Sequence, residues 1–246
     1  MSDEPIPAAT VIVVRDRPAG GCELLMVERA GGMAFAAGAM VFPGGRIDAA
    51  DRAFAQEIGT EAALVAAIRE AIEETAVPVG LSPLPDRDST YALQDALLAD
   101  EPLSTVLARA GLALDPAALT PFARWVPKFH AVRRFDTLFY VAQAPAGDWQ
   151  PRVVEAECAA AEWVAAAEVL ERERAGRAQL IFPTRRTLER LALHSSYAAI
   201  RADALAHAIE PITPWVAERD GDQFITIPAN LGFPVTEERL DELWRG

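Results

Sequence analysis

The alternation of apolar and polar positions predicts strands in the first part of the chain. Residues 9–15 (A-T-V-I-V-V-R) and 23–29 (E-L-L-M-V-E-R) are rich in β-branched and aliphatic side chains, as strands are. A turn rich in proline and glycine, residues 16–21, separates them, so the pattern predicts a hairpin. A short apolar run at residues 40–42 then ends in P-G-G at residues 43–45. Glycines at such a strand end let backbone groups approach a ligand closely.

The period changes to that of an α-helix between residues 61 and 77. At about 100° per residue, apolar side chains gather on one side of the helix and acidic side chains on the other. The apolar side consists of Leu64, Ile68, Ala71 and Ile72, and the acidic side of Glu70, Glu73 and Glu74. We therefore expect one face to pack on a core while three carboxylates crowd each other on the other face.

Carboxylates spaced three and four residues apart destabilise a helix by mutual repulsion. This acidic face is either solvated, or it is compensated by a hard divalent cation bound through oxygen ligands. The sequence on either side of the helix favours the cation.

The middle of the chain predicts a helical insertion. Residues 80–116 begin with a polar loop and continue with two helical patterns, at residues 91–98 and 103–109. The insertion is interpreted as a cap over one face of the sheet, or as a wall of a substrate pocket or a dimer contact.

Strands resume at residues 122–126 and 133–142, and a helix is predicted at residues 166–173. Two more helices follow, the first at residues 185–193 with Thr184 as N-cap, and the second reaching residue 208. Ser195 or Ser196 caps the second. The tail, around residues 212–215 and 224–228, predicts a short strand pair lying over the body of the protein.

Composition and charge narrow the function classes. The 246 residues contain 23 basic and 36 acidic side chains, which gives a net charge of −13. Such a charge disfavours nucleic acids and anionic membranes as partners, although a small anionic substrate is still allowed. No apolar run has the length of a membrane span, and the acidic N-terminus lacks a signal peptide pattern, so a cytoplasmic location is expected. Two cysteines are too few for a disulfide framework or a zinc site.

The order of strand, F-P-G-G, connecting segment and R-E-x-x-E-E resembles the Nudix hydrolases. In that family a glycine, five residues, a glutamate and seven residues precede R-E-U-x-E-E-x-G-U, where U is a bulky aliphatic residue. Glu61 precedes Arg69 by eight positions, as this pattern requires. The later positions that match are Arg69, Glu70, Glu73, Glu74 and Val77.

The sequence departs from the family pattern near the end of the helix. Ala71 is smaller than the usual aliphatic residue, and Ala76 replaces the glycine that normally ends the helix. Pro78 is expected to end the helix instead.

The segment before the helix is also longer than the family pattern. Gly45 lies sixteen residues before Glu61, where the pattern expects six, so the loop at residues 46–60 carries about ten extra residues. Asp51 stands at Gly45 plus six and is the alternative to Glu61 as the first acidic residue of the motif. Glu61 has a second interpretation, as a first-turn acid favoured by the helix dipole, with Thr60 as N-cap.

Two further stretches are similar to a Nudix subgroup that includes the peroxisomal coenzyme A diphosphatases. They are F-A-R-W-V-P at residues 122–127 and R-R-F-D-T-L-F-Y-V-A at residues 133–142. Upstream, the spacing of Arg29, Gly38 and the F-P-G-G run matches the coenzyme A pattern. Ala34, however, stands where that pattern has a second arginine.

Three arginines are candidates for binding the anionic substrate. The subgroup resemblance points to Arg29, and Arg133 and Arg134 lie at the start of a strand, where guanidinium groups suit phosphate oxygens. The alternative for Arg133 or Arg134 is a salt bridge to Asp136.

A last stretch resembles the Nudix region in which a loop glutamate precedes E-W-V and a helix. The resemblance implies that Glu157, six residues before Trp163, completes the metal site or acts as general base, with Glu155 as the alternative. Glu162 is expected to stabilise the strand.

The resemblance implies an α/β (α+β) fold, the Nudix α/β/α sandwich with a mixed sheet, a helical insertion at about 80–118 and a helical C-terminal extension. Residues 1–175 would form the Nudix domain, and residues 176–246 an extension packed on it. The implied activity is hydrolysis of a pyrophosphate linkage in a nucleoside diphosphate derivative, with coenzyme A or an acyl-coenzyme A as the favoured substrate. ADP-ribose or a dinucleotide is the alternative substrate, and a non-catalytic ligand-binding module is the alternative function. A homodimer is left open.

Residue roles follow from the same resemblance. Mg²⁺ or Mn²⁺ would be held by Glu70, Glu73 and Glu74 and the carbonyl of Gly45. Arg69 would orient the carboxylates, for instance by an i,i+4 contact to Glu73. The catalytic set would then be Glu157, Glu74 and Arg69.

Overall fold

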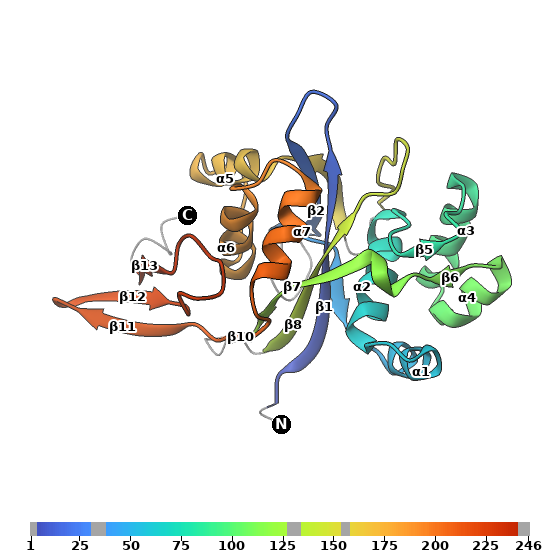
Figure 1. Cartoon of the computed structure of the whole chain (residues 1–246), viewed down its shortest axis with the longest axis horizontal. Coiled ribbons are helices and arrows are strands. Elements are labelled where there is room, and N and C mark those ends of the chain that lie inside the picture. Colours follow the sequence, from blue (N-terminus) through green and yellow to red (C-terminus); the bar gives the residue numbers. More distant parts are fainter. Residues whose placement is uncertain (1–3, 31–37, 127–133, 154–157, 241–246) are drawn as a thin grey trace.

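Strand β1 (Ile6–Asp16) runs through the centre of the main sheet and divides the interior into two cores (Figure 1). In the computed structural model, residues 4–30, 38–126, 134–153 and 158–240 are described. Successive side chains of a strand point to opposite faces. Ala9, Val11 and Val13 accordingly enter one core, whereas Ile12 and Val14 enter the other.

The main sheet is mixed, as predicted. Strands β1 and β8 are parallel, as are β7 and β10, and the other neighbouring strands are antiparallel. The strand order is β10 (Pro211–Ile212), β7 (Leu119–Trp125), β8 (Phe135–Gln143), β1, β2 (Cys22–Arg29) and β3 (Met40–Val41). Two further strands join this sheet: β4 (Gly44–Arg46) pairs with β1, and β9 (Cys158–Val164) pairs with β2. The predicted hairpin is therefore confirmed as β1 and β2.

Helices cover both faces of this sheet, which confirms the predicted α/β/α sandwich (Figure 1). One layer consists of α1 (Ala49–Ile58), α2 (Ala62–Thr75), α3 (Arg87–Leu98) and α4 (Leu103–Ala110), and the other of α5 (Ala166–Arg174), α6 (Phe182–Leu191) and α7 (Tyr197–Ala206). None of the helices in the described ranges is long and apolar enough to cross a membrane.

The segment predicted as an extended loop, residues 46–60, contains helix α1. Asp48 and Asp51 form a capping box at its start, in which the Asp51 carboxylate accepts a hydrogen bond from the backbone N–H of Asp48 at 2.9 Å. Gly59 ends the helix in the left-handed conformation, with φ of 70°. Caps at both ends stabilise this short helix. The residue spacing of the family motif does not indicate a helix here.

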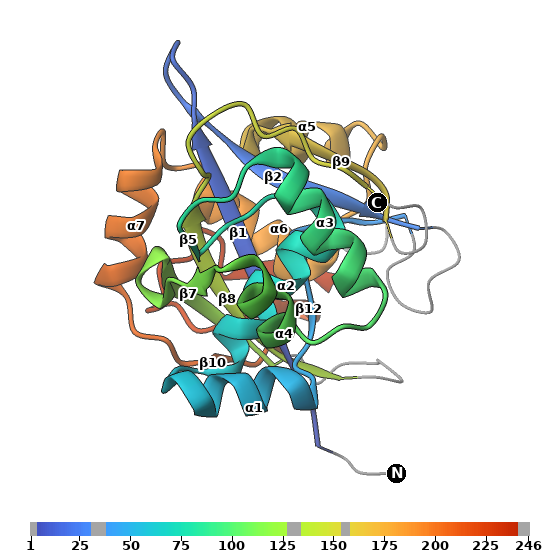
Figure 2. The same cartoon turned by 90° about the vertical axis from the view of Figure 1, so that its right-hand side faces the viewer.

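The predicted insertion helices are confirmed as α3 and α4, which lie in front of α2 in Figure 2. Their apolar faces join the core that also contains the buried face of α2. Two short strands, β5 (Leu81–Ser82) and β6 (Ala113–Leu114), pair at the base of the insertion, followed by a 3-10 turn at Pro116–Ala118. The insertion therefore caps α2 rather than the bare sheet.

The C-terminal part differs from the prediction in two places. Helix α6 has Ile181 as its N-cap, not Thr184, because the proline-containing first turn starts earlier. Helix α7 is capped by Ser196, whose hydroxyl accepts from the N–H of Ala199 at 3.2 Å. Instead of a strand pair over the body, the tail forms a separate sheet that extends outward in Figure 1, with strands β11 (Trp215–Arg219), β12 (Asp222–Thr226) and β13 (Glu237–Arg239).

Candidate active site

Helix α2 presents its acidic residues to the interior rather than to solvent. The side chains of Glu70 and Glu74 both belong to residues that are only 8% exposed. A solvated acidic face is therefore wrong for these two residues. Buried carboxylates require charged or hydrogen-bonding partners.

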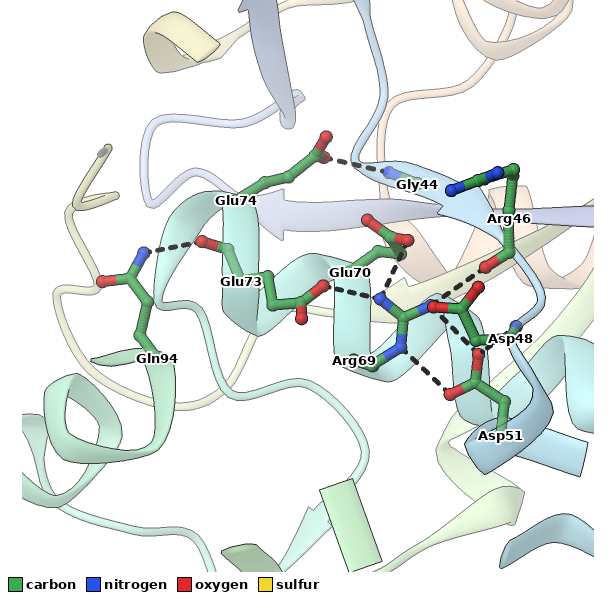
Figure 3. Close-up of polar contacts among 9 residues, drawn as sticks. All are labelled: Gly44, Arg46, Asp48, Asp51, Arg69, Glu70, Glu73, Glu74 and Gln94. Carbon is green, nitrogen blue, oxygen red and sulfur yellow. Dashed lines mark hydrogen bonds and ion pairs between the residues drawn. The ribbon is translucent and has the colours of Figure 1, made fainter. Parts of the chain in front are cut away.

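The guanidinium of Arg69 donates hydrogen bonds to three acidic side chains (Figure 3). It donates two hydrogen bonds to Asp51, both at 3.0 Å, and one each to Glu70 at 3.0 Å and Glu73 at 2.6 Å. The guanidinium also donates a hydrogen bond to the backbone carbonyl of Arg46 at 2.9 Å. The i,i+4 contact to Glu73 is the one that the sequence predicts.

These contacts determine the charge state of Arg69. Burial alone would lower its pKa, but the hydrogen bond to Asp51 and the charges of Glu70 and Glu73 outweigh burial and raise the pKa. Arg69 is thus a permanent cation inside the acidic cluster. The sequence analysis assigns the charge that compensates these carboxylates to a metal ion. For Glu70 and Glu73, the guanidinium of Arg69 supplies such a charge.

The glycine turn lies directly against the acidic side of α2. The backbone N–H of Gly44 donates to a carboxylate oxygen of Glu74 at 3.0 Å (Figure 3). A Cβ atom on Gly45 would lie 2.3 Å from the Glu70 carboxylate oxygen that Arg69 holds, so it would displace that carboxylate. A Cβ atom on Gly44 would lie 2.5 Å from the backbone carbonyl oxygen of Ala9. The two glycines are therefore needed for close approach of the strand to the helix.

The structure separates the two candidates for the first acidic position. Asp51 is 1% exposed and faces Arg69, whereas Glu61 is the N-cap of α2 and accepts a hydrogen bond from the hydroxyl of Tyr140 at 2.9 Å. Thr60 is therefore not the N-cap. Burial of Tyr140 and the neighbouring Glu61 carboxylate raise the pKa of that hydroxyl. Asp51, and not Glu61, belongs to the Arg69 cluster.

The helix ends in a way that the sequence does not predict. Ala76 adopts the left-handed conformation, with φ of 53°, and its N–H donates to the carbonyl of Ile72 at 2.9 Å. A non-glycine residue thus performs the glycine's role at the C-cap, two positions before Pro78. Pro78 is not what ends the helix.

The donor chemistry of this cluster fits a hard divalent cation, since carboxylate oxygens surround the glycine turn. Among residues 4–30, 38–126, 134–153 and 158–240, however, no three acidic, histidine or cysteine side chains converge on one metal position. The predicted convergence of the three glutamates is therefore not found there. One oxygen each of Glu70 and Glu73 is engaged by Arg69, and one of Glu74 by Gly44.

Two of the predicted substrate arginines, Arg29 and Arg134, lie at the end of the sheet where the glycine turn is located. Arg46 is opposite Ala8 in the β1–β4 register, and the carbonyl of Arg134 accepts from the N–H of Ile6 at 2.7 Å, near the same end of β1. Arg29 is the last residue of β2 and pairs with Cys158 at the start of β9.

The partner of Asp136 differs from the alternative derived from the sequence. Arg124 on β7 donates two hydrogen bonds to Asp136, at 2.8 and 2.6 Å. Arg133 lies outside the described residues.

The proposed base also lies outside the described residues, as does its alternative; these are Glu157 and Glu155. Glu162, expected to stabilise the strand, forms an ion pair with Arg172 on α5. Its role in stabilising the strand stays a prediction.

Sequence reasoning missed two residues of this region, Asp48 and Gln94. Asp48 lies 3.8 Å from Arg69, and the D-x-x-D spacing of a capping box is a signal that could have identified it. Gln94 on α3 donates to the backbone carbonyl of Glu73 at 2.9 Å (Figure 3). Nothing in the sequence indicates this contact, which joins residues 21 positions apart.

Parts of the sequence and the fold are similar to known proteins. A family model of the NUDIX domain matches residues 5–101. The fold is similar to the crystal structure of a NUDIX hydrolase from Alicyclobacillus acidocaldarius, with 28% sequence identity and a TM-score of 0.70. That similarity covers 82% of this chain and 97% of the other. No curated protein matches the sequence significantly.

Two further solved structures match with lower scores. The MutT NUDIX hydrolase from Burkholderia pseudomallei has 19% identity and a TM-score of 0.42, over 76% of this chain and 98% of that one. The NUDIX domain of NrtR from Shewanella oneidensis, solved with ADP ribose, has 15% identity and a TM-score of 0.44, over 76% and 86%. Both TM-scores are too low for a conclusion about this chain.

Proposed function

We propose that the chain hydrolyses a pyrophosphate linkage with the help of a divalent metal ion, because a family model of the NUDIX domain matches residues 5–101. The Nudix hydrolase from Alicyclobacillus acidocaldarius, which is similar over most of both chains, supports a pyrophosphohydrolase. The observation that carries the proposal is the acidic cluster around Arg69. It gathers Asp51, Glu70 and Glu73 on one guanidinium, with Glu74 on the adjacent glycine turn.

The proposed roles follow from this arrangement. Glu70, Glu73 and Glu74, with the carbonyl of Gly45, would hold Mg²⁺ or Mn²⁺. Such an ion neutralises phosphate charge and lowers the pKa of a bound water. Arg69 orients Glu70 and Glu73 through the hydrogen bonds described above. Glu157 is proposed to remove the proton from the attacking water, with Glu155 as the alternative.

A nucleoside diphosphate derivative is the proposed substrate class, with coenzyme A or an acyl-coenzyme A favoured. The spacing of Arg29, Gly38 and the F-P-G-G run supports this choice, whereas Ala34 removes one arginine of the coenzyme A pattern. Arg29, Arg133 and Arg134 would contact the phosphates, because guanidinium groups bind phosphate oxygens in pairs. ADP-ribose and dinucleotides are the alternative substrates.

A panel of substrates tests the proposal. Coenzyme A, ADP-ribose, NADH and nucleoside triphosphates are each incubated with the protein and Mg²⁺, and the phosphate-containing products are separated and quantified. We expect coenzyme A to be cleaved into two phosphomonoesters, and EDTA to stop the reaction. A tenfold preference for ADP-ribose would overturn the choice of coenzyme A, but not the proposed reaction type.

Variants assign the roles in the same assay. Glu74→Gln is expected to lose most of the activity, and Glu157→Gln to lower kcat by about 10²–10⁴-fold, as removal of a general base does. Glu57→Gln on the exposed face of α1 is the matched control and should retain wild-type rates. Failure of both wild type and Glu74→Gln to cleave any compound of the panel would favour the ligand-binding module.

A further inference from the structure

The last turn of α2 depends on donors from outside the helix. The final carbonyl groups of a helix have no partner within it. Here the carbonyl of Glu73 accepts from the side-chain amide of Gln94 at 2.9 Å, and the carbonyl of Thr75 accepts from the N–H of Arg152 at 2.8 Å. The turn that carries Glu73 and Glu74 is thus completed by the inserted helix α3 and by the segment before β9.

Gln94 also connects these two elements to each other. Its side-chain nitrogen donates a second hydrogen bond to the carbonyl of Arg152 at 2.9 Å, so both of its N–H groups are used. Gln94 has no exposed surface. One buried amide therefore joins the end of α2 to the segment around Arg152.

Helix α3 holds Arg152 through its side chain as well. The guanidinium of Arg152 donates to Asp95 at 2.7 Å and lies 5.0 Å from the ring centre of Tyr91. Arg152 precedes Glu155 and Glu157 in the sequence by three and five residues. The contacts of α3 thus reach both the acidic turn and the chain that leads to the proposed base.

We propose that Gln94 is a positioning residue, which fixes the turn carrying Glu73 and Glu74 against the segment around Arg152. This inference rests on the proposed function for its effect on catalysis, while its structural part is tested separately. It gives the helical insertion a role, which is to brace the acidic helix rather than only to cover it. Gln94 acts through hydrogen bonds to backbone carbonyls and contacts no substrate.

The test compares two buried substitutions on α3. Gln94→Met keeps the size of the side chain and removes both donors, which leaves two carbonyl groups without their partner. Leu97→Ala removes apolar packing from the same helix but leaves both hydrogen bonds of Gln94 in place. We expect Gln94→Met to lower kcat by about tenfold or more with KM nearly unchanged, because misplaced catalytic groups slow the chemical step. Leu97→Ala should keep kcat within about twofold of wild type while losing stability.

A third variant gives a pH signature. In Gln94→Glu a buried carboxylate would face two carbonyl oxygens, so its pKa would be raised and it would donate a hydrogen bond only when protonated. The kcat of Gln94→Glu relative to wild type should therefore rise as the pH falls. A ratio that falls as the pH falls would contradict the inference, as would an equal loss of kcat in Leu97→Ala.

Amide hydrogen exchange tests the brace without any assay of activity. In Gln94→Met the amide of Arg152, which donates to Thr75, should exchange at least about tenfold faster, whereas the amide of Val126, which donates to Ile212, should not change. Unchanged exchange at Arg152 would overturn the brace. Faster exchange in Gln94→Met with unchanged kcat would overturn the positioning role. Faster exchange in Gln94→Met, together with a wild-type protein that hydrolyses none of the substrates, would refute only the proposed function.

Discussion

At the scale of single residues, Arg69 forms ion pairs with three acidic side chains of the site. Its guanidinium donates hydrogen bonds to Asp51, Glu70 and Glu73. Asp51 is 1% exposed, so its carboxylate is buried against this partner. Removing one member of a buried ion pair is costly because the other is left uncompensated.

We predict that Arg69→Met destabilises the protein by about 3–5 kcal/mol, measured by urea unfolding without divalent metal. Adding Asp51→Asn should recover part of this loss, because the double variant no longer buries an unpaired carboxylate. The difference between the double variant and the sum of the single ones gives the coupling energy. Strictly additive losses would mean that Asp51 does not depend on Arg69.

Ala76 offers a second prediction at this scale. A non-glycine residue in the left-handed conformation costs about 1–2 kcal/mol, and Ala76→Gly removes that cost. The same change loses a buried methyl group, worth about 0.8 kcal/mol, and adds backbone entropy to the unfolded chain. The terms nearly cancel, so we expect the free energy of unfolding to change by less than about 0.5 kcal/mol.

Ala71→Gly is the matched control, since Ala71 is equally buried but lies within the regular part of α2. It gains nothing from relief of a left-handed residue and should cost at least about 1 kcal/mol more than Ala76→Gly. Equal losses for the two variants would show that Ala76 is not strained.

At the scale of elements, periodicity predicted most of what the structure contains. The acidic helix, the first hairpin and the insertion helices follow from side-chain patterns within short windows. Helix α1 was missed because its signal is in the caps, Asp48 and Gly59, and not in a long apolar period. The role of Gln94 could not be predicted, since it depends on how an inserted helix packs against α2.

The choice between Asp51 and Glu61 is also decided by contacts between distant elements. Both match the spacing of the family motif in one of two alignments, but only Asp51 reaches Arg69. We predict that Asp51→Asn lowers kcat by about tenfold or more, because Arg69 loses its fixed geometry. Glu61→Gln should remain within about twofold of wild type. Steady-state kinetics on the preferred substrate distinguish these outcomes, and a larger loss in Glu61→Gln would reverse the assignment.

The contact between α2 and β8 through Glu61 and Tyr140 predicts a dependence on alkaline pH. Burial and the Glu61 carboxylate raise the pKa of Tyr140 above its ordinary value of 10.0. A group whose folded-state pKa is raised favours the folded state below the unfolded pKa, and this advantage is lost as the pH rises. Tyr140→Phe should therefore show a shallower decline in stability above about pH 10 than wild type, measured by thermal unfolding across pH. A parallel decline in both proteins would contradict the effect.

At the scale of the whole molecule, the two faces of the sheet are covered by different parts of the sequence. The helices that follow β4 cover one face, and residues after β9 cover the other. Arg190 on α6 joins several of these later parts. Its guanidinium lies 4.1 Å from the ring centre of Phe122 and donates to Asp203 at 2.7 Å and to the carbonyl of Leu231 at 3.0 Å.

This arrangement bears on whether residues 1–175 could fold alone. A chain that ends at residue 175 would keep Ile12, Val14 and Phe122 but lose the apolar residues that cover them, which are Leu188, Leu191, Ile200, Ile212 and Phe233. Although α5 is retained, exposing the part of this face that α6, α7 and the tail cover removes much of its hydrophobic stabilisation. We therefore predict that the shortened chain binds a hydrophobic dye and lacks the near-ultraviolet circular dichroism of a packed core. A chain ending at residue 240 should unfold cooperatively as the matched control, whereas cooperative unfolding of residues 1–175 would make the C-terminal part an independent extension.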